Sequence, residues 1–224
     1  MIEVYEESFR LREVFAISRG ARTQADVIRA TITRDGLTGQ GESVPYARYG
    51  ETMQSVRDQI ASVRTSITRP ELQTMLPPGA ARNALDCALW DWEAKATGRP
   101  AWQIAGVEQP GRVLTAYTLS LGTPQAMRDQ AARNAMRPLL KTKLGGGNED
   151  ITRIEAVRDG APDARIIVDA NEGWDADSYA RLAPVLLRLG VEMVEQPLPA
   201  GKDDALAHMD RPLCLLYTSD AADD

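Results

Sequence analysis

From residue 113 onward, short apolar runs alternate with longer amphipathic stretches along the chain. Strands that alternate with helices in this way form a parallel sheet, because parallel neighbours need a crossover connection. We expect strands at residues 113–121, 139–144, 165–169, 192–195 and 212–216, with helices at residues 124–136, 148–159, 175–189 and 203–209. These strands are too few to close an eight-stranded β/α barrel, so the pattern predicts a partial barrel of that type.

The first third of the chain has a different pattern. Loose alternation of apolar and polar residues at 9–17, 25–34 and 37–42 predicts antiparallel strands, the last two joined by a tight turn at Asp35-Gly36. Apolar residues spaced three and four apart predict amphipathic helices at 53–67 and 80–97. The fold class we expect is therefore α/β, with an α+β domain at residues 1–111 and an incomplete β/α barrel at residues 112–213.

The composition narrows the class of protein. In 224 residues, 43% are hydrophobic and 26% are charged, which is ordinary for a globular protein. The net charge of −6 argues against a nucleic-acid partner, since phosphate binding needs clustered Lys and Arg. No apolar stretch is long enough to span a bilayer, and the acidic start at Met1–Glu7 does not resemble a signal peptide. With only Cys87 and Cys214 in the sequence, we expect a reduced, cytoplasmic protein with no membrane partner.

Three charged residues each follow an apolar, strand-like run. Lys143, Asp169 and Glu195 are spaced 26 residues apart, an interval that fits one strand, one helix and two loops. In β/α barrels the C-terminal ends of the strands converge on one mouth, where the chemistry takes place. An amine and two carboxylates at such a mouth indicate a general base beside a divalent metal ion.

The neighbours of these residues support this interpretation, although each has a simpler alternative. Lys141 lies two residues before Lys143 on the same strand face, and two adjacent ammonium groups lower each other's pKa, which would favour a base. The alternative is a pair of solvated lysines. Asn171 follows Asp169 on the same face, and carboxylate and amide oxygens suit Mg²⁺. The alternative is a turn in which both side chains bond their own backbone.

Together these motifs resemble the enolase superfamily. Lys-X-Lys, Asp-X-Asn and Glu-Gln-Pro follow one another on successive predicted strands. The segments Gly41–Thr52 and Thr115–Pro124 are similar to those of its dipeptide epimerases, in particular the L-Ala-D/L-Glu type. The resemblance covers about residues 1–213. It implies a capping domain at 1–111, a small dipeptide as substrate and an isomerase that removes the proton alpha to a carboxyl group through an enediolate.

The resemblance also implies roles for individual residues. A lysine base working with Mg²⁺ is the superfamily's known arrangement. It makes Lys143 the proton-transferring base, Lys141 a substrate contact that holds down the pKa of Lys143, and Asp169 and Glu195 the ligands of Mg²⁺. Asn171 would support these ligands, Thr118 would contact the substrate, and residues 19–23 match a mobile loop that closes over it. Within that loop Arg22 is our candidate for binding a glutamyl carboxylate, since its planar fork suits a carboxylate; a solvated surface arginine is the alternative.

The last residues depart from the family's pattern. A third metal ligand should fall near Thr218, and a second lysine should come from a later strand; neither is present. Residues 214–224 are therefore expected to be a non-native tail, from a frameshift or sequencing junction, on an inactive gene fragment. Two alternatives remain open: another reaction of the superfamily, such as muconate-type cycloisomerisation or sugar-acid dehydration, and a non-catalytic remnant. Whether the intact family member is a homo-oligomer is also open.

Overall fold

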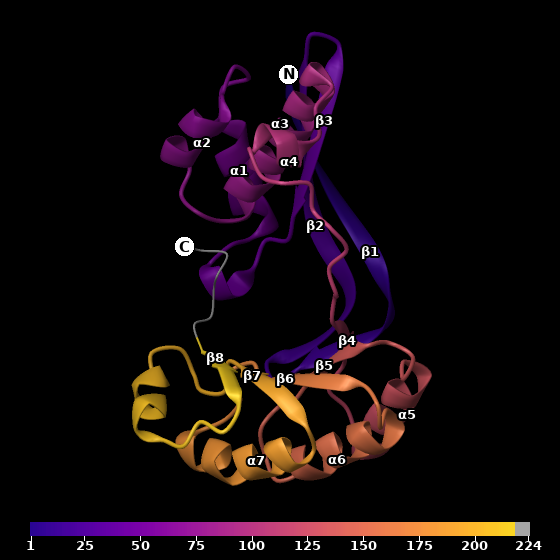
Figure 1. Ribbon diagram of the computed structural model, residues 1–224. Coiled ribbons are helices and arrows are strands. Elements are labelled where there is room, and N and C mark those ends of the chain that lie inside the picture. The colour runs from indigo at the N-terminus through magenta and orange to yellow at the C-terminus, as the bar shows by residue number, and fades with distance from the viewer. Residues whose placement is uncertain (218–224) are drawn as a thin grey trace. The chain divides into compact units, whose positions relative to one another are not determined.

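The computed structural model describes residues 1–217, and the chain divides into two compact units (Figure 1). The first unit contains Met1–Leu11 and Gln24–Arg112. The second contains Arg12–Thr23 and, within the described part of the chain, residues 113–217. One unit has an antiparallel sheet with helices and the other a parallel sheet with helices, so the expected α/β class is confirmed.

The first sheet has the order β1-β2-β3, and β2 pairs with β3 in antiparallel register. Its strands are β1 (Ile2–Ile17), β2 (Gly20–Arg34) and β3 (Leu37–Ser43). At the expected turn, Asp35 and Gly36 have φ values of 50° and 76°, as a two-residue hairpin with positive φ at both positions requires. The helical elements that follow are η1 (Ala47–Tyr49), α1 (Met53–Ala61), α2 (Arg69–Met75), α3 (Ala80–Thr97) and α4 (Ala101–Ile104).

The contact between β3 and α3 depends on two glycines. A Cβ atom at Gly39 would lie 2.1 Å from Ala88 O, and one at Gly41 would lie 2.1 Å from Ala84 O. Only residues without a Cβ let the strand approach the helix backbone this closely. The buried face of α3 includes Ala84, Leu85, Ala88 and Leu89, which join the core of this unit.

The helix that we expected at residues 53–67 is wrong in its length. It ends at Ala61, and Thr68 then caps α2 in a capping box with Glu71. Val63 and Ile67 are buried nonetheless, at 7% and 1% exposure, although they lie outside both helices. Their spacing therefore predicted burial correctly and helix continuation incorrectly.

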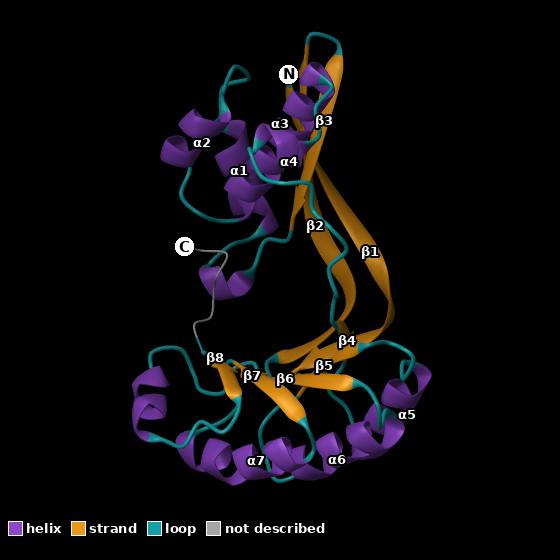
Figure 2. Cartoon of the chain, viewed as in Figure 1, coloured by secondary structure: helices purple, strands orange, loops and turns teal. Residues whose placement is uncertain are grey.

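The second sheet is parallel and has the order β4-β5-β6-β7-β8 within the described part of the chain. Its strands are β4 (Tyr117–Leu119), β5 (Leu139–Lys143), β6 (Arg165–Asp169), β7 (Val191–Glu195) and β8 (Cys214–Leu216). The crossovers contain α5 (Pro124–Arg133), α6 (Asp150–Gly160), α7 (Ala176–Arg188) and the 3₁₀ helix η2 (Asp203–His208). In Figure 2, α5, α6 and α7 follow one another along the same face of the sheet. This is the expected partial barrel.

The first of these strands is shorter than predicted. Only Tyr117–Leu119 pairs with β5, while Val113 and Leu114 are 80% and 49% exposed. Alternation alone did not distinguish a paired strand from an extended, exposed connection. The last strand, β8, is also short and starts at Cys214 rather than Pro212.

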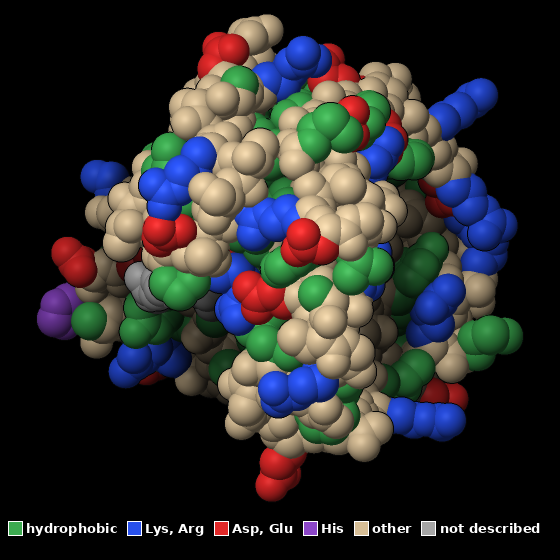
Figure 3. All heavy atoms as spheres, turned by 90° about the horizontal axis from the view of Figure 1, so that it is seen from above, with side chains coloured by type: hydrophobic (Ala, Val, Ile, Leu, Met, Phe, Trp, Pro, Cys, Tyr) green, Lys and Arg blue, Asp and Glu red, His purple; other side chains and the backbone are tan. Residues whose placement is uncertain are grey.

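Among residues 1–217, no helix is both long and apolar enough to cross a membrane. On the face shown in Figure 3, acidic and basic side chains are interspersed among the described residues, as the mixed charge of the sequence suggests.

Candidate active site

The register of the parallel sheet places the three charged residues in one row. Lys143 pairs with Asp169, and Asp169 pairs with Glu195, so all three lie at the C-terminal ends of adjacent strands. Two residues earlier along the strands, a second row contains Thr118 and Lys141, which pair with each other. Because side chains alternate along a strand, residues two apart lie on the same face, so both rows face the same side of the sheet.

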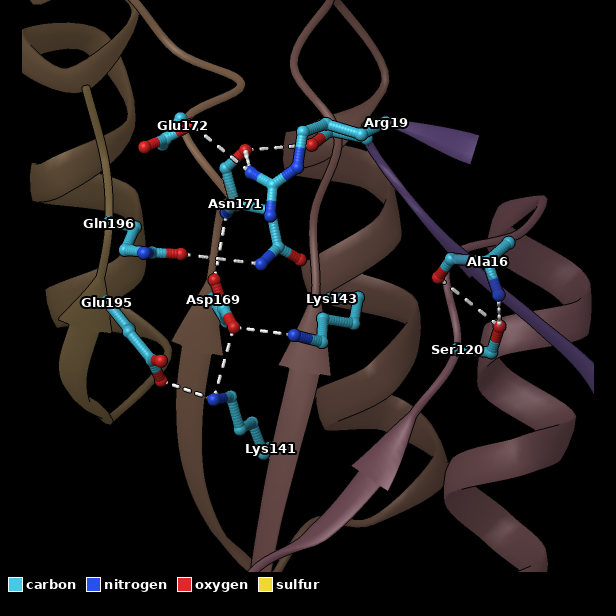
Figure 4. A network of polar contacts seen from close by, with 11 residues as sticks. Ala16, Arg19, Ser120, Lys141, Lys143, Asp169, Asn171, Glu172, Glu195 and Gln196 are labelled. Atoms are coloured by element: carbon cyan, nitrogen blue, oxygen red, sulfur yellow. Dashed lines mark hydrogen bonds and ion pairs between the residues drawn. The ribbon is translucent and has the colours of Figure 1, made fainter. Parts of the chain in front are cut away.

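The charged side chains contact one another within the first row and between the two rows (Figure 4). Lys143 Nζ lies 2.5 Å from Asp169 Oδ2, and Lys141 Nζ lies 3.1 Å from the same oxygen. Lys141 Nζ also donates a hydrogen bond to Glu195 Oε2. One ammonium group is thus shared by both carboxylates. The four residues that we predicted as the base, its partner and the metal ligands therefore form a single cluster: Lys143, Lys141, Asp169 and Glu195.

The cluster is partly removed from water, and this affects its ionisation. Burial favours the neutral form of Asp169, but its hydrogen bond from Lys143 and the charges of both lysines outweigh that effect and lower its pKa. Burial likewise disfavours the charged form of Lys141, but its hydrogen bond to Glu195 and the charge of Asp169 raise its pKa. We expected the two neighbouring lysines to lower each other's pKa. The pKa of Lys141 is raised instead, because its interactions with two carboxylates outweigh the effect of one like charge.

Left-handed backbone follows both carboxylates. Asn171, Glu172 and Gln196 have φ values of 48°, 64° and 45°, a conformation that residues other than glycine rarely adopt. Main-chain hydrogen bonds join the two turns: Glu172 N–H donates to Gln196 O at 2.8 Å. Asn171 N–H donates to Asp169 Oδ1 at 2.8 Å and so orients that carboxylate. Strained backbone held by several partners is typical of functional sites.

The remaining predicted site residues are placed differently. Asn171 is 6% exposed and lies beside the cluster, where its N–H contacts Asp169. Thr118 is half-buried on β4, in register with Lys141. Arg22 is exposed on β2. Arg19 instead reaches this region, because its Nη1 donates to Asn171 O at 2.8 Å.

A second set of residues that the sequence did not reveal holds the loop after Lys143. Asp150 is fully buried at the start of α6, where its Oδ2 accepts the N–H of Gly146 at 2.8 Å and Trp174 Nε1–H at 2.8 Å. Arg153 Nη1 lies 3.0 Å from Asp150 Oδ1 and balances its charge. The carboxylate therefore ties the loop after β5 to the loop after β6. An Asp early in a helix is common, so no sequence signal identified this one.

The residues at the strand ends fit a divalent cation. Asp169 and Glu195 already share one cationic group, the Lys141 ammonium, so both can reach a common positive centre. Asn171 Oδ1 is buried and has no hydrogen-bond partner among residues 1–217, so an oxygen atom is available next to the two acids. No group of three or more Asp, Glu, His or Cys side chains suited to a metal occurs in this part of the chain. The expected third position, near Thr218, lies outside the described residues.

Comparison with known protein families gives two matches. Residues 1–106 match the mandelate racemase/muconate lactonizing enzyme N-terminal domain, and residues 126–215 match the enolase C-terminal domain-like family. The chain is 45% identical over 219 residues to L-Ala-D/L-Glu epimerase of Escherichia coli strain K12, with 95% of this chain and 68% of that protein covered. The chain belongs to the enolase superfamily.

Other relatives are also isomerases. N-acetyl-D-glutamate racemase of a Pseudoalteromonas species is 41% identical over 183 residues, covering 79% of this chain and 58% of the racemase. A crystal structure from Agrobacterium tumefaciens, an enolase family member with bound sodium and L-Ala-L-Glu, superposes with a TM-score of 0.91 at 46% identity. It covers 96% of this chain and 67% of that one.

Magnesium is present in more distant members. A dipeptide epimerase from Methylococcus capsulatus complexed with Mg and L-Arg-D-Lys has a TM-score of 0.84 and 29% identity, covering 94% of this chain and 64% of that one. The chain thus spans about two thirds or less of the length of these relatives. Two of these relatives are dipeptide epimerases, the class that the motifs of the sequence predicted.

Proposed function

We propose that this chain forms part of an epimerase that acts on glutamate whose α-amino group is acylated, with L-Ala-D/L-Glu as the first candidate. The observation that carries the proposal is the shared contact of Lys143, Lys141, Asp169 and Glu195 at the ends of adjacent strands. Two relatives above 40% identity support the substrate class. L-Ala-Glu and N-acetylglutamate both present a glutamate with an amide at its α-nitrogen.

In this proposal Asp169 and Glu195 hold Mg²⁺, and Asn171 supports them. When bound, the ion supplies positive charge to the substrate carboxylate as negative charge develops on its oxygens. Lys143 takes the α proton on one face of the substrate, so it must be neutral when the substrate binds. Lys141 contributes a positive charge next to the same carboxylate, and Thr118, which pairs with Lys141 in the sheet, contacts the substrate.

Division into a capping domain (1–111) and an incomplete barrel (112–213) belongs to the same proposal. Arg22 remains the candidate for the distal glutamyl carboxylate. Its guanidinium suits that group, and it lies three residues after Arg19, which does contact the turn beyond Asp169.

Inversion at a carbon atom needs a group that accepts a proton on one face of the substrate and a second group that donates one on the opposite face, whereas exchange of the α proton needs only the first. The chain contains four lysines, and only Lys141 and Lys143 among them lie on the sheet. We therefore expect Lys143 alone to exchange the α proton of one enantiomer without converting it to the other.

The test incubates the purified chain with Mg²⁺ in D₂O and either L-Ala-L-Glu, L-Ala-D-Glu or N-acetylglutamate. Mass spectrometry then detects deuterium at the α carbon, and chiral chromatography detects inversion. Deuterium in one enantiomer of an acylated glutamate supports the proposal. Incorporation into none of these compounds, or equal incorporation into a muconate or sugar acid, contradicts it.

A further inference from the structure

The end of β1 and the turn that follows it belong to the second unit, and each contacts other residues of that unit (Figure 4). Ala16 N–H donates to Ser120 Oγ at 2.7 Å, and Leu121 N–H donates to Ala16 O at 3.0 Å. These bonds fix the end of β1 beside the end of β4. The start of the turn that follows is therefore fixed by bonds that do not involve Arg19.

The second contact is made by the turn itself. Ser18 Oγ donates to Asn171 O at 2.9 Å, and Arg19 Nη1 donates to the same carbonyl oxygen at 2.8 Å. Arg19 Nη1 also lies 3.3 Å from Glu172 Oε2, and the Glu172 side chain is only 9% exposed. Two donors thus bind the carbonyl oxygen of Asn171, and an ion pair binds the side chain of Glu172. Together these contacts hold the segment Asn171–Glu172.

That segment is the strained one. Asn171 and Glu172 are consecutive left-handed residues, and Asn tolerates this conformation more easily than Glu. A non-glycine residue keeps such a conformation only when its surroundings over-determine it. The other end of the Asn171 backbone points to the site, since its N–H donates to Asp169 Oδ1. Arg19 is therefore connected to the Asp169 carboxylate through the backbone of a single residue.

The electrostatic surroundings of Glu172 favour the same connection. Burial raises the pKa of Asp203, and the negative charges of Glu172 and Asp204 raise it further. Glu172 is thus near another acid, and the guanidinium of Arg19 provides positive charge next to its carboxylate. Loss of that guanidinium would remove positive charge that offsets these acids and so weaken the hold on the turn.

We propose that Arg19 is a positioning residue that holds the left-handed turn at Asn171–Glu172 and thereby orients the Asp169 carboxylate. Its importance for a bound Mg²⁺ ion rests on the proposed function. The structural part of the proposal does not, because it concerns only contacts among residues of this chain.

The test compares hydrogen exchange of individual amides by NMR in the unaltered chain, Arg19→Ala and Arg19→Lys. The reporter amides are those of Asn171 and Glu172, which donate to Asp169 Oδ1 and Gln196 O. Arg19→Ala should speed their exchange by about tenfold, because the turn opens locally more often. Arg19→Lys, which keeps the charge and one donor, should restore part of the protection.

Two controls separate this effect from a general loss of stability. The amide of Leu144, which donates to Asp169 O, should keep its rate in all variants. Arg128→Ala removes another arginine–carboxylate pair, to Asp159 on α6, and should leave the reporter amides unchanged. Unaltered exchange at Asn171 and Glu172 in Arg19→Ala, or equal acceleration by Arg128→Ala, would overturn the proposal.

Calorimetric titration with Mg²⁺ then tests the link to the metal. We expect Arg19→Ala to weaken binding by about threefold to tenfold, as loss of a partner that orients a ligand does, and Arg128→Ala to have no effect. Unchanged affinity in Arg19→Ala would overturn the link between the turn and the ion. If the unaltered chain binds no Mg²⁺, the metal part of the proposed function fails, while the exchange rates still decide the role of Arg19.

Discussion

The two faces of the parallel sheet contain residues from the same strands and have opposite character. On one face Leu140, Ile166, Val168 and Val194 are 0% exposed and join the core. On the other face the same strands carry Lys141, Lys143, Asp169 and Glu195, which contact one another. The two-residue period of a strand is enough to separate them. Residues that stabilise the fold thus alternate along each strand with residues of the candidate site. Substitutions of one kind should therefore have little effect on the property that the other kind supports.

The largest effect should follow loss of the Lys143 amine. Lys143→Met keeps much of the length of the side chain but cannot accept a proton, so exchange of the α proton should fall by about 10²- to 10⁴-fold. The rate of deuterium incorporation measures this. Lys95→Met is the matched control, because Lys95 is an exposed lysine on α3 that pairs with Asp91. Retention of exchange in Lys143→Met would show that another group is the base.

The next largest effect should be on folding and should come from the opposite face. Leu140 is fully buried beside Lys141, and Leu140→Ala should reduce the free energy of unfolding by about 2–5 kcal/mol. Urea denaturation followed by circular dichroism measures the loss. Met193→Ala, on the polar face and only half-buried, should cost less. Equal losses for the two variants would contradict the division between the faces.

A smaller effect is expected for a single metal ligand. Glu195→Gln removes one negative charge but keeps the shape, so Mg²⁺ affinity should fall by about tenfold to a hundredfold. Isothermal titration calorimetry provides the measurement. Glu192→Gln is a control on the same strand, because Glu192 lies near the start of β7, away from the strand end, and pairs with Arg165. Similar losses for both variants would mean that general acidity, not the position of Glu195, attracts the ion.

The smallest effect should come from the buried carboxylate of Asp150. Asp150→Asn keeps the size but weakens the bonds from Gly146 and Trp174, so the free energy of unfolding should fall by about 1–3 kcal/mol. Thermal denaturation followed by tryptophan fluorescence should show the change. Asp159→Asn, at an exposed ion pair, should have less effect. A neutral Asp150→Asn would indicate that the loop after β5 does not depend on this residue.

Much of the site could be predicted because it follows from local rules. The interval of 26 residues between Lys143, Asp169 and Glu195 is the length of one βα unit. Parallel pairing of adjacent strands therefore places these three residues side by side. The apolar run before each charge indicated its strand. Resemblance to known motifs then supplied roles that spacing alone could not.

The missing parts depend on contacts between residues distant in the sequence. Arg19 contacts Asn171 across 152 positions, and nothing near Arg19 distinguishes it from Arg22. The pKa of Lys141 depends on Glu195, which lies 54 positions away, so the local pair of lysines predicted the wrong direction. The end of the first predicted helix was wrong for a related reason. Ile67 is buried by tertiary packing rather than by a continuing helix.

The central claim is that Asp169 and Glu195 can hold one cation between them. Crystals of the chain grown with Mn²⁺, which substitutes for Mg²⁺ at oxygen ligands, would locate the ion by anomalous scattering. We expect a peak in contact with both carboxylates, with the Lys141 ammonium moved away from the position it now shares between them. An anomalous peak elsewhere, or none at saturating Mn²⁺ with the two acids still paired to Lys141, would contradict the account.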